Sequence, residues 1–383
     1  MVPYRRFQAA AGPDADSDDE DHILHVVGHY QPAQLQLMAL PIEIIVWIFE
    51  IYCHTYRIRS KHLTLSKLLY AALVPLVYRH PVLKATNFYG FVDAITKKRH
   101  LGRQVKQLDM STVVQLGKNA FVAKLLKRLA PSLETFVAPC TSFGFGPLLA
   151  LKNCLNLKIL DLSLVLEMLD LGELFRLVSR LQHLTHLAFP RSLVEITDYE
   201  TICWPPRLAH LHISGGVTDD FLIKLTFPLT ITTLEFSNCP QIHDSGFHDI
   251  LLKVGRNLTC FRIQYPMPNL SLGALDVVFN YAPFLKELEV LVEYVLGTFF
   301  DEDNLVPDPQ RPLRVLYLGS LGSLGTTTKL DPIDLAIALD DGRLPNLKHV
   351  ITLARLGWGE NTESVAYIAD DLDQKGGGLR MVH

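Results

Sequence analysis

The sequence predicts an α/β fold, a solenoid with a curved parallel sheet inside and helices outside, preceded by a small all-α module. A short pattern with apolar residues at positions 1, 4 and 6 recurs ten times along the 383 residues. Successive copies lie 23 to 34 residues apart, which leaves room for one strand and one helix. Such a unit cannot bury its apolar faces alone, so it needs copies on both sides. The copies begin at Val105, Leu133, Leu157, Leu184, Leu208, Ile231, Leu258, Leu285, Leu313 and Leu347.

The clearest copy is Ile231–Leu251, which reads ITTLEFSNCPQIHDSGFHDIL. On a strand, the residues at positions 4 and 6 point to one side and those at positions 3, 5 and 7 to the other. We expect Cys239 to turn the chain away from the strand with its small side chain buried. Ser245, or alternatively Asp244, can then cap a helix. One face of that helix is apolar and carries Phe247, Ile250, Leu251 and Val254.

Ten such copies in phase resemble a leucine-rich-repeat array. The segment Ser237–Phe247 resembles the cysteine-containing subtype, in which Cys-x-x-Ile-x-Asp-x-Gly-Phe follows the strand, and Gly215–Leu225 is a shorter relative of it. A leucine-rich helical protein is the alternative, but the 1-4-6 phase and the helix-length spacers argue against it. The resemblance therefore implies a leucine-rich-repeat solenoid.

Two apolar stretches precede the array. Leu40–Tyr52 predicts a helix with Pro41 in its first turn, and this helix is apolar nearly all round. A module this short can cover such a helix only partly, so we expect a partner protein to cover the rest. Leu63–Leu83 predicts a second helix that ends near Val74, because Pro75 cannot continue it.

The two stretches, LPIEIIVWIFEIY and LSKLLYAALVPLVYRHPVL, together resemble an F-box, and VPLVYRHPVLKATNFYGFV is most similar to F-box proteins of fungi. This resemblance implies binding to a Skp-type adaptor and, through it, to a cullin scaffold. A helical cap that shields the first repeat from water is the alternative, and both can hold. The residues implied to face the adaptor are Leu40, Pro41, Ile44, Ile45, Ile48, Phe49, Leu65, Leu69 and Leu73.

We expect four segments in chain order. They are a disordered acidic N-terminal arm (1–38), the F-box (39–88), the repeat array (89–355) and a C-terminal cap and tail (356–383). In the last segment, a helix should cap the open sheet edge, and residues from Lys375 onward should fray. The arm can also accept phosphate at Ser17. The carboxylates of the arm repel one another and keep the arm extended. The acidic residues are Asp14, Asp16, Asp18, Asp19, Glu20 and Asp21.

Composition and motifs exclude several classes of function. A net charge of −4 argues against nucleic-acid binding through a basic surface, and no apolar run is long enough for a membrane span. No signal-peptide core is present and the six cysteines form no C-x-x-C pair, which predicts a cytoplasmic or nuclear protein with free thiols. No phosphate-loop, nucleophile-elbow or zinc-protease motif occurs, so we expect no enzyme and no cofactor. We also expect no metal site, although two histidine groups have suggestive spacing: His22, His25 and His29, and His186, His210 and His212.

The F-box resemblance implies a substrate receptor of a Skp–cullin–F-box ubiquitin ligase, which positions a target for ubiquitin-dependent degradation. A non-ligase scaffold and a leucine-rich-repeat enzyme regulator are the alternatives. The target itself is not identified by the sequence.

On the concave face, position 5 of the ten copies is expected to form one column: Asp109, Val137, Asp161, Ala188, His212, Glu235, Arg262, Glu289, Tyr317 and Ile351. Its second half is polar and alternates in charge. We therefore expect the target to dock there, with the loop Asp301–Pro309 or the C-terminal segment as the alternatives. The candidate target-binding residues are His212, Glu235, Arg262, Gln264, Glu289, Leu291 and Tyr317.

Overall fold

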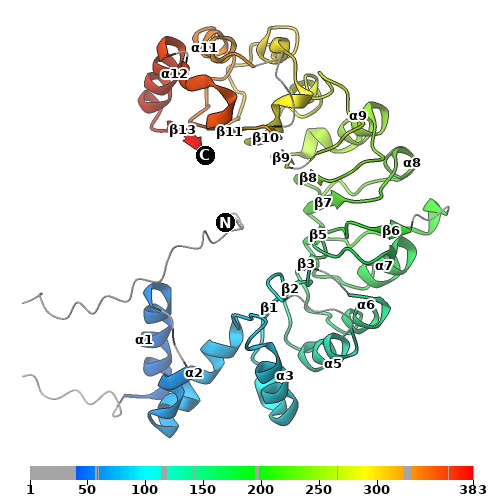
Figure 1. Cartoon of the computed structure of the whole chain (residues 1–383), viewed down its shortest axis with the longest axis vertical. Helices are drawn as coiled ribbons and strands as arrows, with labels where there is room; N and C mark the ends of the chain where they lie inside the picture. The colour runs from blue at the N-terminus through cyan, green and yellow to red at the C-terminus, as the bar shows by residue number, and fades with distance from the viewer. Residues whose placement is uncertain are drawn as a thin grey trace, which may run out of the picture.

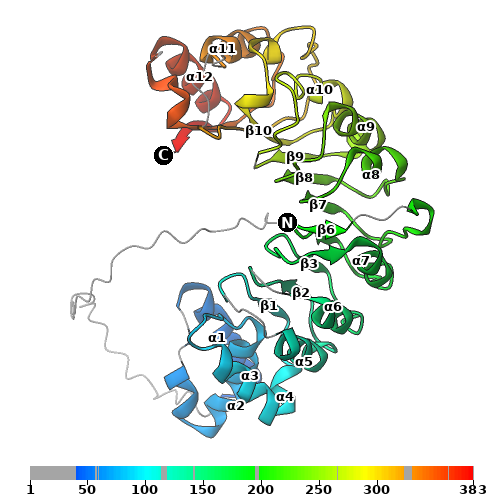
Figure 2. The ribbon, with the colours of Figure 1, turned by 45° about the vertical axis from the view of Figure 1, so that its right-hand side comes forward.

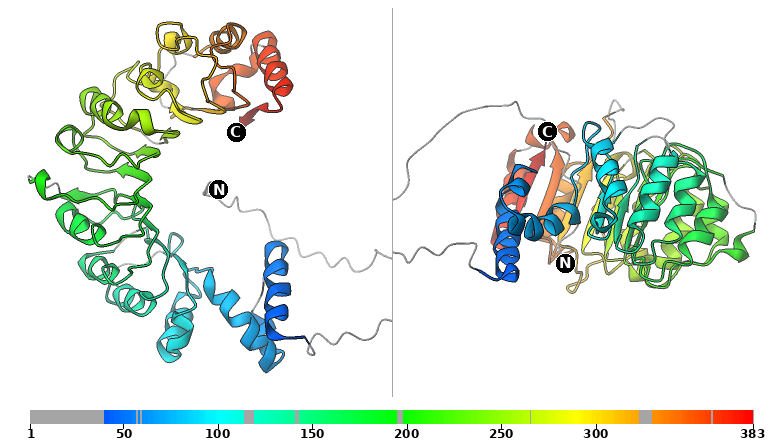
Figure 3. Two further views of the ribbon diagram at one scale, coloured as in Figure 1. Left: turned by 180° about the vertical axis from the view of Figure 1, so that it is seen from behind. Right: turned by 90° about the horizontal axis from the view of Figure 1, so that it is seen from below.

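In the computed structural model the chain forms an arc, with strands along its inner side and helices along its outer side (Figures 1 and 2). A helical module lies at the N-terminal end of the arc, and the view from behind shows the same arrangement (Figure 3). The structure describes residues 40–382 apart from 57, 59, 114–118, 141–142, 195–197, 265, 323–329 and 361. The acidic arm, with Ser17 and the first histidine group, lies outside the described residues.

The N-terminal module contains α1 (Ile42–Thr55), η2 (Ser60–Thr64) and α2 (Lys67–Arg79). Ser66 caps α2, since its Oγ accepts a hydrogen bond of 3.1 Å from the Leu69 backbone N–H. The two helices pack around a small core of their own. The fully or nearly fully buried residues of this core are Ile45, Leu69, Ala72 and Leu73.

Helix α2 continues through Pro75, so the expected end near Val74 is wrong. A proline inside a helix removes one backbone hydrogen bond and costs about 3 kcal/mol. Leu73 and Val74, directly before it, are buried. Tertiary packing of this apolar turn therefore outweighs the local cost of the proline.

Helices α3 (Phe88–Lys97) and α4 (Arg99–Gly102) join the module to the first strand. Their buried residues Phe88, Ile95 and Leu101 belong to the large core of the array. These two helices thus cover the first repeat.

Eleven parallel strands form the large sheet, in the order β1-β2-β3-β5-β7-β8-β9-β10-β11-β12-β13, and the two remaining strands pair separately. The ten predicted strands are all present in this order. In the large sheet they are β1 (Gln107–Asp109), β2 (Thr135–Val137), β3 (Ile159–Asp161), β5 (His186–Ala188), β7 (His210–Ser214), β8 (Thr233–Ser237), β9 (Cys260–Ile263), β10 (Glu287–Leu291), β11 (Val315–Gly319), β12 (His349–Leu353) and β13 (Gly378–Val382); the separate pair is β4 (Leu169–Asp170) and β6 (Leu193–Val194).

Helices cover the outer side of the sheet (Figure 1). Packed helices need about 8–10 Å between axes and strands only about 4.8 Å, so the stack curves with its strands inside. The α-helices are α5 (Asn119–Leu129), α6 (Phe145–Leu151), α7 (Leu171–Val178), α8 (Asp219–Lys224), α9 (Asp244–Val254), α10 (Val278–Tyr281), α11 (Pro332–Asp340) and α12 (Thr362–Gln374); the further 3-10 turns are η3 (Tyr199–Thr201), η4 (Gly255–Asn257), η5 (Val292–Tyr294), η6 (Gly297–Phe300), η7 (Ala354–Leu356) and η8 (Trp358–Glu360).

The turn from β8 into α9 follows the repeat pattern with one exception. Cys239 is fully buried, and its Sγ lies 3.5 Å from the Ile213 carbonyl oxygen of the preceding repeat. Neither Ser245 nor Asp244 caps α9, however. The cap residue is His243, whose backbone N–H donates to the Asp219 carboxylate at 2.8 Å. The helix start is therefore stabilised by the neighbouring repeat, which local sequence does not reveal.

The C-terminal segment continues the array. Residues after Lys375 were expected to fray, but Gly378–Val382 form β13 and pair in parallel with β12. Helix α12 packs beside α11, where the Tyr367 hydroxyl lies 2.9 Å from an Asp340 carboxylate oxygen. Backbone pairing along a whole strand, together with burial of the α12 side facing α11, explains why this segment is ordered.

Candidate protein-interaction surfaces

Helix α1 has an exposed apolar face. Its side chains follow helical spacing, and Trp47 is the most exposed at 61%. A contiguous apolar surface of this kind marks an interaction site. We call it the α1 apolar face, and it consists of Ile44, Trp47, Ile48, Ile51, Tyr52 and Tyr56.

The residues implied to face the adaptor fall into two groups. Pro41, Ile44, Ile48 and Leu65 are exposed, while Leu40 and Phe49 are half-buried. The other three are buried in the contact between α1 and α2, so they support the α1 apolar face from beneath: Ile45, Leu69 and Leu73.

Four exposed members of the α1 apolar face were missed by the sequence interpretation. Trp47 and Ile51 lie on the same face as Ile44 and Ile48, and Tyr56 lies at the helix end. The sequence indicated that one side of α1 stays open, because the helix is apolar nearly all round, but it did not indicate which side. The fourth missed residue is Tyr52.

The concave face of the sheet carries the predicted column in register. Glu235 is the strand partner of His212 on one side and of Arg262 on the other, and Glu289 pairs with Arg262 and with Tyr317. The column from Asp109 to Ile351 is confirmed at each step, and β13 adds one further member, Arg380.

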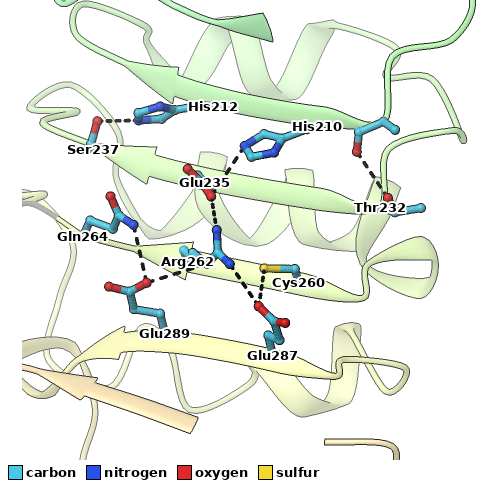
Figure 4. A network of polar contacts seen from close by, with 11 residues as sticks. His210, His212, Thr232, Glu235, Ser237, Cys260, Arg262, Gln264, Glu287 and Glu289 are labelled. Atoms are coloured by element: carbon cyan, nitrogen blue, oxygen red, sulfur yellow. Dashed lines mark hydrogen bonds and ion pairs between the residues drawn. The ribbon is translucent and has the colours of Figure 1, made fainter. Parts of the chain in front are cut away.

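A charged network occupies the middle of this column (Figure 4). Arg262 is its centre, with Nη1 at 2.5 Å from Glu235 Oε1, Nη2 at 3.0 Å from Glu287 Oε2 and Nε at 3.7 Å from Glu289 Oε2. On the other side of Glu235, His210 Nε2 lies 3.5 Å from Oε1. One guanidinium thus faces three carboxylates, and its charge is balanced within the protein.

The network shifts the pKa values of two members. Burial alone would raise the pKa of Glu235, but the hydrogen bond from His210 and the charges of His210, His212 and Arg262 hold it at about 2. Burial lowers the pKa of His186 to about 4, and the adjacent His210 adds to this effect. At neutral pH, Glu235 is therefore ionised and His186 is uncharged.

The seven candidate target-binding residues differ in how accessible they are. Only Gln264 is exposed, whereas Arg262, Glu289 and Tyr317 are half-buried. Leu291 was expected to offer an apolar contact, but it is 5% exposed and packs in the main core. The other two, His212 and Glu235, are buried by neighbouring side chains because concave curvature crowds this face. His212 Nε2 forms a contact of 2.6 Å with Ser237 Oγ.

The alternative target site, the loop Asp301–Pro309, is held against the array by two buried arginines. Arg343 donates to the Phe300 carbonyl oxygen, and Arg311 donates to the Val306 carbonyl oxygen at 2.6 Å. Leu305 is fully buried inside the loop, while Asp301, Glu302 and Asp303 are exposed. This loop therefore presents exposed carboxylates from a fixed backbone.

Within the described ranges, no cluster of three or more histidine, cysteine or carboxylate side chains is arranged to hold a metal ion. This includes His186, His210 and His212, two of which are engaged in the concave network. Among the helices that the structure describes, none is both long and apolar enough to cross a membrane.

No protein-family model matches the sequence. Two curated proteins are similar over most of its length. F-box protein YDR306C of Saccharomyces cerevisiae is 43% identical over 329 residues, which are 85% of this chain and 69% of that protein. Protein pof5 of Schizosaccharomyces pombe is 35% identical over 301 residues, which are 79% of this chain and 85% of that protein.

Among solved structures, one chain of the crystal structure of the Rad7 and Elc1 complex in yeast is similar at 14% identity and a TM-score of 0.40, covering 85% of this chain and 83% of that one. This similarity is too low to bear on fold or function. The identities to the two curated proteins, by contrast, are high and extend over 85% and 79% of this chain. The chain therefore belongs to the family of F-box proteins.

Proposed function

We propose that this protein is the substrate-recognition subunit of a Skp–cullin–F-box ubiquitin ligase. The α1 apolar face binds the adaptor, and the concave side of the repeat array binds the target. The observation that carries the proposal is the exposure of Trp47, Ile48 and Ile51 on a helix that packs against α2 through the buried Ile45.

The physical argument for a partner at α1 is the cost of leaving this face in water. Burial of apolar surface contributes roughly 25 cal/mol of favourable free energy per Å², so a partner that covers the α1 apolar face is stabilised there. Tryptophan and tyrosine are frequent anchors of protein interfaces, and the α1 apolar face holds Trp47, Tyr52 and Tyr56. Ile45 and Leu73 fix the helix from below, so the face is preorganised for docking.

The proposed mechanism is positioning. The adaptor holds the protein at one end of the ligase and the array holds a target, which raises the effective concentration of target lysines near a ubiquitin-conjugating enzyme. The chemical step belongs to that enzyme, so we propose that this protein makes or breaks no covalent bond. A cytoplasmic or nuclear location is part of the proposal and is supported by free thiols at Cys140, Cys154, Cys203, Cys239 and Cys260.

The test is a pull-down of the full chain from cell extract, comparing wild type with Ile44→Asp combined with Ile48→Asp. Both side chains are exposed, at 40% and 38%, so the repeats should stay folded. Docking the variant would bury two charges at a cost of several kcal/mol. Wild type should recover an adaptor together with a cullin, and the variant should recover neither.

A matched control is Leu252→Asp, which places the same charge on an exposed leucine of α9 (68% exposed) far along the chain from α1. It should recover adaptor and cullin as wild type does. Recovery of an adaptor without a cullin would instead indicate a scaffold outside the ligase. Undiminished adaptor binding by the α1 double variant would show that the α1 apolar face is not the docking site.

A further inference from the structure

The residue immediately before each strand of the large sheet forms a row along one edge of the array. Backbone pairing stacks these residues: the Arg314 N–H donates to the Lys286 carbonyl at 2.8 Å, and the Lys348 N–H donates to the Arg314 carbonyl at 3.0 Å. We call this the pre-strand row. From β1 to β13 it reads Lys106, Glu134, Lys158, Thr185, Ala209, Thr232, Thr259, Lys286, Arg314, Lys348 and Gly377.

In the N-terminal part of the pre-strand row, two lysines share one carboxylate. Glu134 lies between two lysines, and its two carboxylate oxygens are 2.8 Å from Lys106 Nζ and 2.8 Å from Lys158 Nζ. Hydrogen bonds from these lysines lower the pKa of Glu134 to about 2. The middle of the row is uncharged and consists of Thr185, Ala209, Thr232 and Thr259.

The C-terminal part of the pre-strand row also has three charged residues on consecutive strands. Its middle residue, however, is the cation Arg314, where the N-terminal part has Glu134. Lys286, Arg314 and Lys348 are all exposed, and in the part of the chain that the structure describes none of them forms an ion pair. The nearest acidic residue in sequence, Glu287, is already engaged by Arg262 at 3.0 Å. Neighbouring strands are about 4.8 Å apart, and like charges directly opposite one another are destabilising.

At the C-terminal end of the pre-strand row, no side chain follows Lys348. The next position is Gly377, where an added Cβ would lie 1.7 Å from the Lys348 carbonyl oxygen. The close approach of the chain therefore excludes any side chain that could cover or neutralise Lys348 from that strand. Further along β13, Arg380 is exposed and adds positive charge to the same end of the array.

We propose that Lys286, Arg314 and Lys348 bind the acidic block of this chain's own N-terminal arm, residues 14–21. This block holds six carboxylates in eight residues, and no lysine or arginine occurs between positions 7 and 56. The charges of the two segments are thus complementary, and among the described residues the three cations form no ion pair. The proposal does not depend on the ligase function.

The last repeats curve back toward the side on which α1 lies, across the open side of the arc (Figures 1 and 3). Eighteen residues separate the acidic block from Leu40, and a chain of that length can span at most about 60 Å. Phosphorylation at Ser17 would add about two negative charges to the block and strengthen the contact.

The test is zero-length carboxylate-to-amine cross-linking of the full chain at low salt, followed by digestion and mass spectrometry. We expect amide bonds from residues 14–21 to Lys286 and Lys348 within one monomer. These should be lost at an ionic strength of about 1 M, where the screening length is about 3 Å. Lys106 and Lys158 are the internal control and should link to Glu134 but not to the arm.

The decisive variant is Arg314→Glu, which retains both reactive lysines and copies the arrangement of Lys106, Glu134 and Lys158. It should lose the cross-links to the arm while its melting temperature stays equal to or above that of wild type; Arg314→Lys should keep the cross-links. The proposal is overturned if wild type shows no arm cross-links at Lys286 or Lys348, if Lys106 and Lys158 react equally with the arm, if the products are only intermolecular, or if Arg314→Glu leaves them unchanged.

Discussion

Arg262 on β9 and Glu235 on β8 are strand partners, and their side chains form an ion pair of 2.5 Å at the centre of the concave face. The Glu235 side chain is 11% exposed and that of Arg262 is 23% exposed, so the pair is largely removed from water. Breaking a buried pair leaves an uncompensated charge, which costs far more than losing a surface pair. This part of the predicted target site therefore also stabilises the array.

Arg262→Glu should destabilise the protein by about 1–3 kcal/mol, because it places a fourth carboxylate among Glu235, Glu287 and Glu289. Thermal unfolding followed by circular dichroism measures the effect. Gln264→Ala, at an exposed position two residues away, should change stability by no more than about 0.5 kcal/mol. Equal melting temperatures for Arg262→Glu and wild type would contradict a stabilising role for the pair.

Stability should fall in two stages as the pH is lowered. The folded state holds the pKa of His186 at about 4 against 6.5, so the unfolded chain takes up a proton first and stability decreases from about pH 6.5 to 4. The pKa values of Glu235 and Glu134 are both lowered from 4.5 to about 2, so their contribution is present above pH 4.5 and is lost as the pH falls toward 2. Urea unfolding across this range measures both stages. His186→Gln should remove the first stage alone, and a pH profile identical to wild type would exclude His186 as its source.

Two neighbouring residues of β8 can be used to check which side of the strand faces the core. Leu234 is fully buried, and Leu234→Ala should cost about 2–5 kcal/mol. Thr233 lies on the opposite side of the strand and is half-buried, so Thr233→Ala should cost within about 0.5 kcal/mol. Chemical denaturation of the two variants distinguishes the sides, and similar losses for both would refute the assigned phase.

Target recognition is best tested with concave residues that are accessible and lie outside the Glu235–Arg262 pair. Gln264→Ala combined with Tyr317→Ala should reduce recovery of the target from cell extract while adaptor recovery and melting temperature stay near wild type. These two side chains flank Glu289, and Gln264 Nε2 lies 3.4 Å from its carboxylate. Unchanged target recovery would move the site to the exposed carboxylates of the Asp301–Pro309 loop or to the C-terminal segment.

The repeat architecture was determined by the sequence itself. Alternation along a strand assigns Leu234 and Glu235 to opposite sides, and a repeating unit brings the same position of each copy side by side. For this reason the whole column from Asp109 to Ile351 could be written down from spacing alone, and the strand register agrees with it throughout.

The accessible surface was decided only by the tertiary structure. Periodicity shows that α1 is apolar all round, but the packing of Ile45 against α2 selects which side stays open and leaves Trp47 exposed. Likewise, the curvature of the sheet crowds Glu235, and the core beneath β10 takes up Leu291. The spacing of apolar residues, and the side of a strand on which they lie, are local properties of the chain. Exposure depends on which surfaces meet, and those contacts join residues far apart in sequence.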